Sequence, residues 1–233
     1  MKTLILLTAI PFAMSHGCAF GNDGTGNVIT ENRTVTTFTG ISLECHATVY
    51  FTQGDEQSVK VEASDNIMSH IVTVVQDRSL DIKLEDGFKT REPITVYVTV
   101  KELCQLAVAG SGKMIGKSHI NCDNMSLGVA GSGDITADIR SLAVKISVSG
   151  SGGLNLSGTT TSMDIKIAGS GNVNAKDLQA INSTVALTGS GSSIINTKEE
   201  LNVSITGSGG VRYVSEPAKV KSNITGSGNV SKI

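Results

Sequence analysis

Hydrophobic and polar residues alternate along most of the chain beyond residue 100. Apolar side chains recur two, four and six positions before the first residue of a repeated tripeptide. A period of two is typical of a β-strand with one buried face. The sequence therefore predicts that a strand precedes each copy of the tripeptide. Four of these strands have the inward residues Met125, Leu127, Val129; Val144, Ile146, Val148; Met163, Ile165, Ile167; and Leu201, Val203, Ile205.

The tripeptide is Gly-Ser-Gly, and its seven copies are spaced by 21, 19, 19, 20, 18 and 19 residues. Near-constant spacing indicates that each copy occupies the same position in a repeated structural unit. The copies lie at 110–112, 131–133, 150–152, 169–171, 189–191, 207–209 and 226–228.

The alternation continues through most copies of the tripeptide to an apolar residue two positions beyond, namely Ile135, Leu154, Val173, Val211 and Val230. We therefore expect one strand, bent or straight, across each copy, with both glycines facing inward and the serine facing outward. A unit of about 19 residues cannot bury its own apolar face, so it must stack on its copies. The predicted fold is all-β: a parallel β-helix, or β-solenoid, with each coil adding one rung and a right-handed coil as the default. Antiparallel hairpins are the main alternative, but they predict two alternating repeat types.

The N-terminal third has a different pattern of residues. The segments 47–52, 59–63, 71–75, 80–84 and 94–100 read as strands, but they lack Gly-Ser-Gly and carry more charge. We expect an irregular strand region that forms the first coils or a cap over the sheet edge. The expected organisation is a signal peptide at 1–17, a flexible linker at 18–33, an N-terminal β region at 34–100 and the repeat solenoid at 101–233.

The first residues have the features of a secretory signal: Lys2, a short apolar run from 4 to 14, and small residues before Cys18. Cys18 is a candidate lipidation site of the bacterial lipoprotein type, although the branched apolar residue usual three positions before it is absent. Cleavage by an ordinary signal peptidase is the alternative. We expect an exported protein that is attached to a membrane only through such a lipid.

Composition limits the chemistry. The formal net charge is -2 and charged residues make up 17%, so no nucleic-acid partner is expected. Without Cys18, three cysteines remain in an oxidising compartment, so at most one disulfide could form. Cys104 and Cys122 lie about one repeat apart, but we favour Cys104 as a small buried core residue over a bridge.

The chain resembles a bacterial family described as putative auto-transporter adhesin, head GIN domain. The resemblance covers nearly all of the exported chain, from Phe38-Thr39-Gly40-Ile41 through 47–51, 59–66 and 80–82 to 106–112 and the later copies. It implies a β-helical, extracytoplasmic and often lipid-anchored protein of a Gram-negative bacterium, exported to the periplasm, outer membrane or cell surface. It implies no established activity.

The sequence gives little support for a catalytic site or a metal site. Acidic residues of the repeat region are scattered over different coil positions, and His46, His70 and His119 have no metal-ligand spacing. Sugar-cleaving sites usually contain aromatic platforms, and the chain has no Trp. We expect no enzyme, cofactor or metal, with a polysaccharide-cleaving β-helix enzyme as one alternative.

A binding surface is the favoured function: a non-enzymatic adhesin or binding module that presents a Ser/Thr-rich solenoid face to a surface glycan or protein. Alanines at 109, 130 and 168 interrupt this face. A purely structural envelope scaffold, with Ser and Thr as soluble strand formers, is the other alternative. The candidate residues are Ser149, Ser151, Thr188, Ser190, Thr206, Ser208, Thr225 and Ser227.

Overall fold

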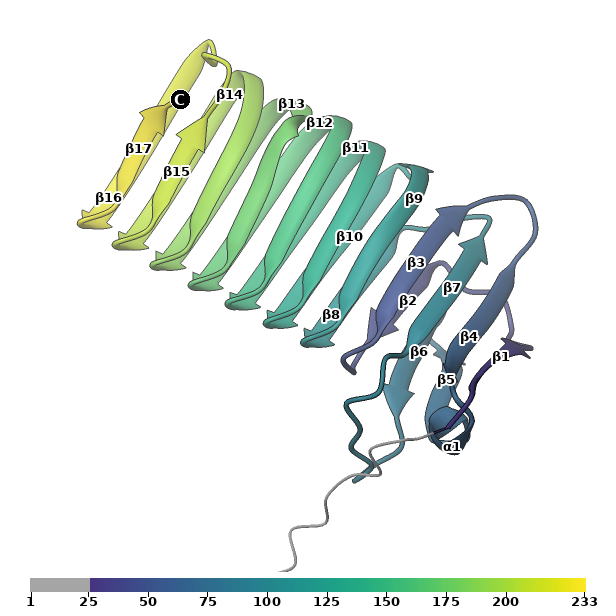
Figure 1. Cartoon of the computed structure of the whole chain (residues 1–233). Helices are drawn as coiled ribbons and strands as arrows, with labels where there is room; N and C mark the ends of the chain where they lie inside the picture. Colours follow the sequence, from purple (N-terminus) through teal and green to yellow (C-terminus); the bar gives the residue numbers. More distant parts are fainter. Residues whose placement is uncertain (1–25) are drawn as a thin grey trace, which may run out of the picture.

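The computed structural model describes residues 26–233, which form one elongated stack of strands with a short helix near its first end (Figure 1). The predicted signal peptide and Cys18 lie outside the described residues. The N-terminal part contains β1 (Val28–Arg33), β2 (Gly40–Leu43), β3 (Thr48–Gln53), β4 (Ser58–Ser64), α1 (Asp65–Met68), β5 (Ile71–Gln76), β6 (Ser79–Leu84) and β7 (Thr95–Val100). The repeat part contains β8 (Gln105–Gly110), β9 (Lys113–Asn121), β10 (Asn124–Gly131), β11 (Asp134–Gly150), β12 (Gly153–Gly169), β13 (Asn172–Gly189), β14 (Ser192–Gly207), β15 (Gly210–Tyr213), β16 (Lys219–Gly226) and β17 (Asn229–Lys232).

Each coil of the repeat part has two walls. Wall 1 consists of the strands that lead into a Gly-Ser-Gly copy: β8, β10, the second halves of β11 to β14, and β16. Wall 2 consists of the strands that leave it: β9, the first halves of β11 to β14, β15 and β17. Neighbours within each wall pair in parallel, as in β11 and β12, where 134–141 align with 153–160 and 143–150 with 162–169. The parallel β-solenoid with coils of about 19 residues is confirmed.

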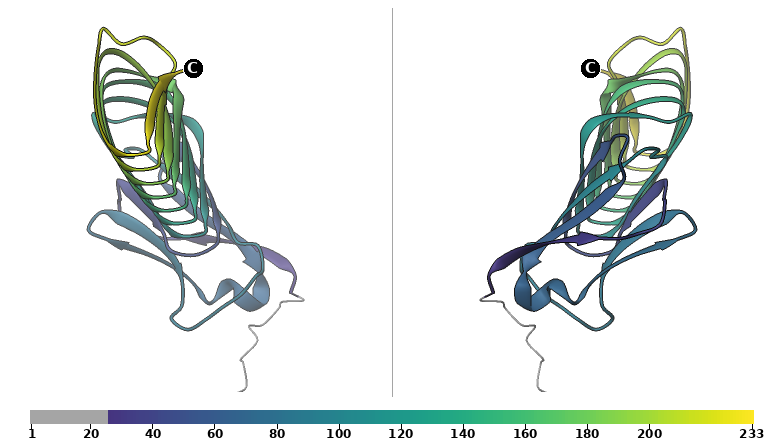
Figure 2. Two further views of the ribbon diagram at one scale, coloured as in Figure 1. Left: turned by 90° about the vertical axis from the view of Figure 1, so that its left-hand side faces the viewer. Right: turned by 90° about the vertical axis from the view of Figure 1, so that its right-hand side faces the viewer.

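Both walls of a coil send alternate side chains into one interior. The predicted inward residues of wall 1 are buried, and so are alternate residues of wall 2. Figure 2 shows the coils as a stack of flattened loops that share this interior. In β11 the buried set is Ile135, Ala137, Ile139, Val144, Ile146 and Val148.

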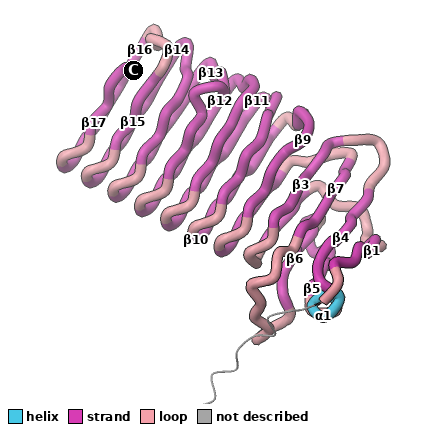
Figure 3. The backbone as a smooth tube through the Cα atoms, in the orientation of Figure 1, coloured by secondary structure: helices cyan, strands magenta, loops and turns pink. Residues whose placement is uncertain are grey.

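The Gly-Ser-Gly copies form a row of corners along one edge, drawn as loops in Figure 3. The expectation of one strand across each copy is wrong, since β11 ends at Gly150 and β12 begins at Gly153. The first glycine of every copy has φ between 114° and 124°, a conformation that L side chains rarely adopt, and this turns the chain from wall 1 to wall 2. Each coil therefore adds one strand segment to each of two walls instead of one rung.

The two glycines of a copy differ in position, which corrects the expectation that both face inward. Gly150 is half-exposed, whereas Gly152 is buried, and a Cβ on Gly152 would lie 2.5 Å from Cγ1 of Val129. The serine between them, Ser151, is exposed as predicted. Stacked corners are joined by backbone hydrogen bonds, for example from Ser151 N and Gly152 N to Gly131 O, at 2.8 and 2.9 Å.

The N-terminal part supplies two further coils, and their order in space differs from their order in the chain. Strand β2 pairs in parallel with β6 on one side and β8 on the other, and β3 pairs with β7 and β9 in the same way. The coil made by β2 and β3 is thus enclosed between β6–β7 and β8–β9. Residues 101–104 connect β7 to β8 past this enclosed coil.

Antiparallel strands cover the first end of the stack. Strand β5 pairs with β6, β4 pairs with β7, and β1 pairs with β4, all antiparallel. Helix α1 lies between β4 and β5 at the same end (Figure 1). The predicted irregular N-terminal strand region is confirmed. No helix among the described residues 26–233 is long and apolar enough to cross a membrane.

Candidate functional site

The predicted Ser/Thr residues lie on two columns along the Gly-Ser-Gly edge. The parallel register places one residue per coil in each column, because Gly169, Gly189, Gly207 and Gly226 align from coil to coil. All eight predicted residues are exposed, so water or a ligand can reach every hydroxyl. The column before the glycine contains Ala109, Ala130, Ser149, Ala168, Thr188, Thr206 and Thr225, and the column after it contains Ser111, Ser132, Ser151, Ser170, Ser190, Ser208 and Ser227.

The second column has a serine in every copy, but both columns carry hydroxyls on consecutive coils only at the last three copies. Threonines occupy three consecutive positions of the first column there, whereas Ser149 has an alanine on either side. We call the part with hydroxyls in both columns the hydroxyl ladder, defined by Thr188, Ser190, Thr206, Ser208, Thr225 and Ser227. Ser149 and Ser151 share its edge but are separated from it by the coil that carries Ala168 in the first column.

The chemistry of the hydroxyl ladder is uncharged hydrogen bonding. Each hydroxyl can donate one hydrogen bond and accept others. Consecutive rungs of a sheet are about 4.8 Å apart, so the ladder repeats its donors and acceptors at this interval. Such a surface is suited to a ligand that also repeats hydroxyl or amide groups.

The histidines predicted to have no metal role are engaged in local contacts. His70 Nδ1 lies 2.7 Å from Glu85 Oε2, and His119 Nδ1 lies 2.8 Å from Asp138 Oδ2. Within residues 26–233, no group of three or more His, Cys, Asp or Glu side chains is placed to hold a metal ion.

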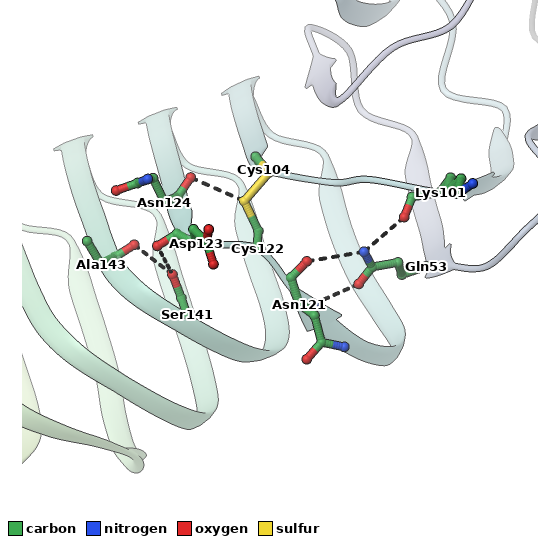
Figure 4. Close-up of a disulfide and its surroundings, with 9 residues drawn as sticks. All are labelled: Gln53, Lys101, Cys104, Asn121, Cys122, Asp123, Asn124, Ser141 and Ala143. Carbon is green, nitrogen blue, oxygen red and sulfur yellow. Dashed lines mark hydrogen bonds between the residues drawn. A yellow bond between two sulfur atoms is a disulfide. The ribbon is translucent and has the colours of Figure 1, made fainter.

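A disulfide joins Cys104 to Cys122, which overturns the preference for Cys104 as an unbridged core residue (Figure 4). Cys104 follows the connection from β7, and Cys122 lies between β9 and β10, so the bridge attaches this connection to the following coil. Gln53 supports the same region, because its side-chain amide donates to the carbonyl oxygens of Lys101 and Asn121. Sequence spacing could not decide the pairing, because the enclosed coil determines where the connection passes.

Cys45 is the remaining cysteine of the described residues, and it is buried. It lies between β2 and β3, at the corner of the enclosed coil, where its backbone packs against Gly112. Burial raises the pKa of its thiol, so the thiol stays protonated and unreactive at neutral pH.

The structure contains a stacked pair of aromatic side chains that the sequence patterns did not predict. Tyr50 and Tyr97 stack with ring centroids 5.6 Å apart. The Lys60 ammonium lies 4.6 Å from the centroid of the Tyr97 ring, and the Lys117 ammonium lies 4.3 Å from that of the Tyr50 ring. The available signal was the tripeptide Thr-Val-Tyr, which occurs at 48–50 and again at 95–97. The enclosed coil brings the two copies side by side, because β3 pairs with β7.

A family model and several solved structures match the chain, and they bear on its family and on its fold respectively. The model of the family described as putative auto-transporter adhesin, head GIN domain, matches residues 37–217. No curated protein matches the chain.

Crystal structures of similar fold come from species of Bacteroides and Parabacteroides. A putative adhesin of Bacteroides fragilis has 23% sequence identity and a TM-score of 0.82, over 89% of this chain and 97% of that one. A protein of Parabacteroides distasonis described as a putative lipid binding protein has 24% identity and a TM-score of 0.74, over 91% and 98%. A putative adhesin of the same organism has 22% identity and a TM-score of 0.72, over 91% and 99%. At these identities the likeness concerns the fold alone.

Proposed function

Because the chain belongs to the putative auto-transporter adhesin, head GIN domain family, we propose that it is a non-enzymatic, exported binding module whose hydroxyl ladder contacts a surface glycan or protein. The single observation that carries the proposal is the register of the last three repeat coils, which presents six exposed hydroxyls in two adjacent columns. A rigid sheet holds these groups before a ligand arrives, so little conformational entropy is lost on binding.

Bulky substitution on the hydroxyl ladder tests this role. The pair Ser190→Tyr and Ser208→Tyr places two rings on neighbouring exposed rungs, where they should block a ligand without entering the core. The matched control is Ser147→Tyr with Lys166→Tyr, two exposed neighbours on the outer face of wall 1. Binding is measured with the purified protein on a glycan array and by adhesion of cells that express it.

We expect the ladder variant to lose binding and the control variant to keep it, with both melting like the unmodified protein. Equal binding by the ladder variant would remove the ladder from the proposal. A protein that binds no glycan and supports no adhesion would favour a structural envelope scaffold instead.

The proposal includes export and a lipid anchor. The signal peptide at 1–17 would be removed, Cys18 would carry the lipid, and residues 18–33 would link it to the β region at 34–100 and the solenoid at 101–233. Metabolic labelling with palmitate in a Gram-negative host should label the unmodified chain and not Cys18→Ser. Equal labelling of both proteins would refute the anchor, and protease treatment of intact cells would separate a surface location from a periplasmic one.

A further inference from the structure

A long groove follows the corner opposite the Gly-Ser-Gly edge, and neither the sequence patterns nor the family description assigns it a role. Its volume is about 1080 Å³. The second corner is the point where β9 leads into β10 and where β11, β12 and β13 pass from wall 2 to wall 1. The groove spans these corners and reaches Lys198 in β14.

Small residues form the floor of the groove. Ser141 and Thr160 align in the parallel register and are half-buried and buried. Their hydroxyls donate to backbone carbonyls of their own corner, Ser141 to Ala143 at 2.8 Å and Thr160 to Ser162 at 3.0 Å. The disulfide side chain of Cys122 lines the first end of the groove, beside Ser141 and Asp123 (Figure 4).

Exposed side chains flank each floor position in the sequence. The residue before each corner position is polar and exposed, and these residues align as Arg140, Thr159 and Gln179. The residues after the corner positions that line the groove include Leu142, Thr161, Ile181 and, after Thr197, Lys198. Leu142 and Ile181 are 60% and 42% exposed, although large apolar side chains usually avoid water. The groove lining therefore combines hydrogen-bonding groups with two exposed aliphatic side chains.

The cations of the groove are unpaired. Arg78, Arg140 and Lys198 line it, and none of them has a carboxylate within 4.0 Å among the described residues. Two acidic residues, Glu102 and Asp123, also line the groove, and they lie within two residues of Cys104 and Cys122 in the chain. Away from the disulfide, from Arg140 to Lys198, the charged groups that line the groove are positive.

The length and the chemistry select one class of occupant. Five stacked corners, about 4.8 Å apart, give a trough of roughly 19 Å. An extended peptide would need a free strand edge for backbone pairing, and the corner strands already pair with coils on both sides. An acyl chain needs an enclosed apolar pocket, and here the large aliphatic groups, Leu142 and Ile181, are exposed and separated by Thr161. A sugar chain presents C–H faces and hydroxyl edges that match such separate aliphatic contacts among hydrogen-bonding groups.

We propose that the groove at the second corner binds a linear glycan that carries carboxylate groups, with Arg140 and Lys198 holding carboxylates and Leu142 and Ile181 contacting ring faces. Charged hydrogen bonds between guanidinium and carboxylate are among the stronger polar contacts. The inference rests on the proposed function only in assuming that the protein binds glycans, and it places the acidic class on the face opposite the hydroxyl ladder.

The test uses oligogalacturonate, a linear polyuronate, and the same oligomer after carboxyl reduction. Calorimetry compares the unmodified protein with Arg140→Gln plus Lys198→Gln, and with Leu142→Ser plus Ile181→Ser. The matched control is Lys145→Gln plus Arg212→Gln, two exposed cations outside the groove. We expect salt-sensitive binding of oligogalacturonate, a loss of about tenfold or more in both groove variants, and a change within about twofold in the control.

Three results would overturn the groove proposal. They are absence of oligogalacturonate binding at ~1 mM, equal affinity for the carboxyl-reduced oligomer, and unchanged affinity in Arg140→Gln plus Lys198→Gln. The ladder variant Ser190→Tyr plus Ser208→Tyr separates the two proposals. It should bind oligogalacturonate normally, and if it alone loses binding, the ladder is the site and the groove proposal fails.

Discussion

The structural role of the first glycine of each Gly-Ser-Gly copy can be tested directly with the substitution Gly150→Ala. Gly150 has φ of 114°, which costs a residue with a Cβ about 1–3 kcal/mol. The new Cβ would also lie 2.5 Å from the carbonyl oxygen of Gly131 and 3.2 Å from its carbonyl carbon. These atoms are backbone of the neighbouring coil, so they cannot rotate away as a flexible side chain could. Overfilling of this kind adds about 1–3 kcal/mol.

The two contributions predict a loss of about 4 kcal/mol in the free energy of unfolding. For a domain of this size, such a loss lowers the melting temperature by roughly 8–16 °C. The matched control is Gly128→Ala in β10 of the adjoining coil, where a new Cβ meets nothing within 4 Å and φ is ordinary. The control should melt like the unmodified protein or slightly higher, because alanine reduces the entropy of the unfolded chain.

Circular dichroism during heating and during urea titration measures both variants. A Gly150→Ala protein that melts with Gly128→Ala would show that the corner relaxes, and the account of the first glycine would be wrong. Gly152→Ala gives an independent reading of the second glycine. It should also destabilise the protein, but through contact with the backbone carbonyl oxygen of Gly133 and the buried Val129 side chain instead of through φ.

Two further predictions concern the disulfide and the last coils. Replacing both Cys104 and Cys122 by serine should lower the free energy of unfolding by about 3 kcal/mol, because the bridge closes a loop of sequence separation 18. Dithiothreitol should lower the melting temperature of the unmodified protein to that of the double variant, and no response to the reductant would contradict the bridge. The hydrogen bond from Lys221, together with the Lys219 charge, lowers the pKa of the Glu200 carboxyl. The stabilisation that this ion pair gives to the folded state is therefore present above the ordinary pKa of glutamate and is lost as pH falls through the lowered pKa. Glu200→Gln should therefore speed hydrogen exchange in β16 at pH ~7, and this difference should shrink on acidification; a difference independent of pH would refute the role of the ion pair.

Several features of the fold could be predicted from local pattern alone. Alternation with period two determines which side chains of a strand face the core, as for Val144, Ile146 and Val148. Near-constant spacing then requires equivalent coils, because a lone strand of this kind cannot bury its apolar face. The outward position of Ser151 and the alignment of Thr188, Thr206 and Thr225 followed from the same two facts.

The role of the glycines was partly hidden, because the alternation runs on through Gly150 and Gly152 as though the strand were continuous. Glycine has no side chain whose polarity reports its direction, so the pattern could not distinguish an inward residue from a corner residue with positive φ. The second corner was hidden for a related reason. Ser141 and Thr160 look like ordinary strand residues until the register shows them stacked on one floor.

By itself, the sequence determined the all-β stacked repeat, the coil length and the inward face of each predicted strand, since these depend on contacts between neighbouring positions and on regular spacing. Only the tertiary structure decided that β2–β3 is enclosed between β6–β7 and β8–β9, that Cys104 reaches Cys122, that Tyr50 meets Tyr97, and that a groove runs along the second corner. The physical reason is that these features depend on which distant segments pair. Any strand with one apolar face can pair with several others, and the choice is made by how connections pass around the finished stack.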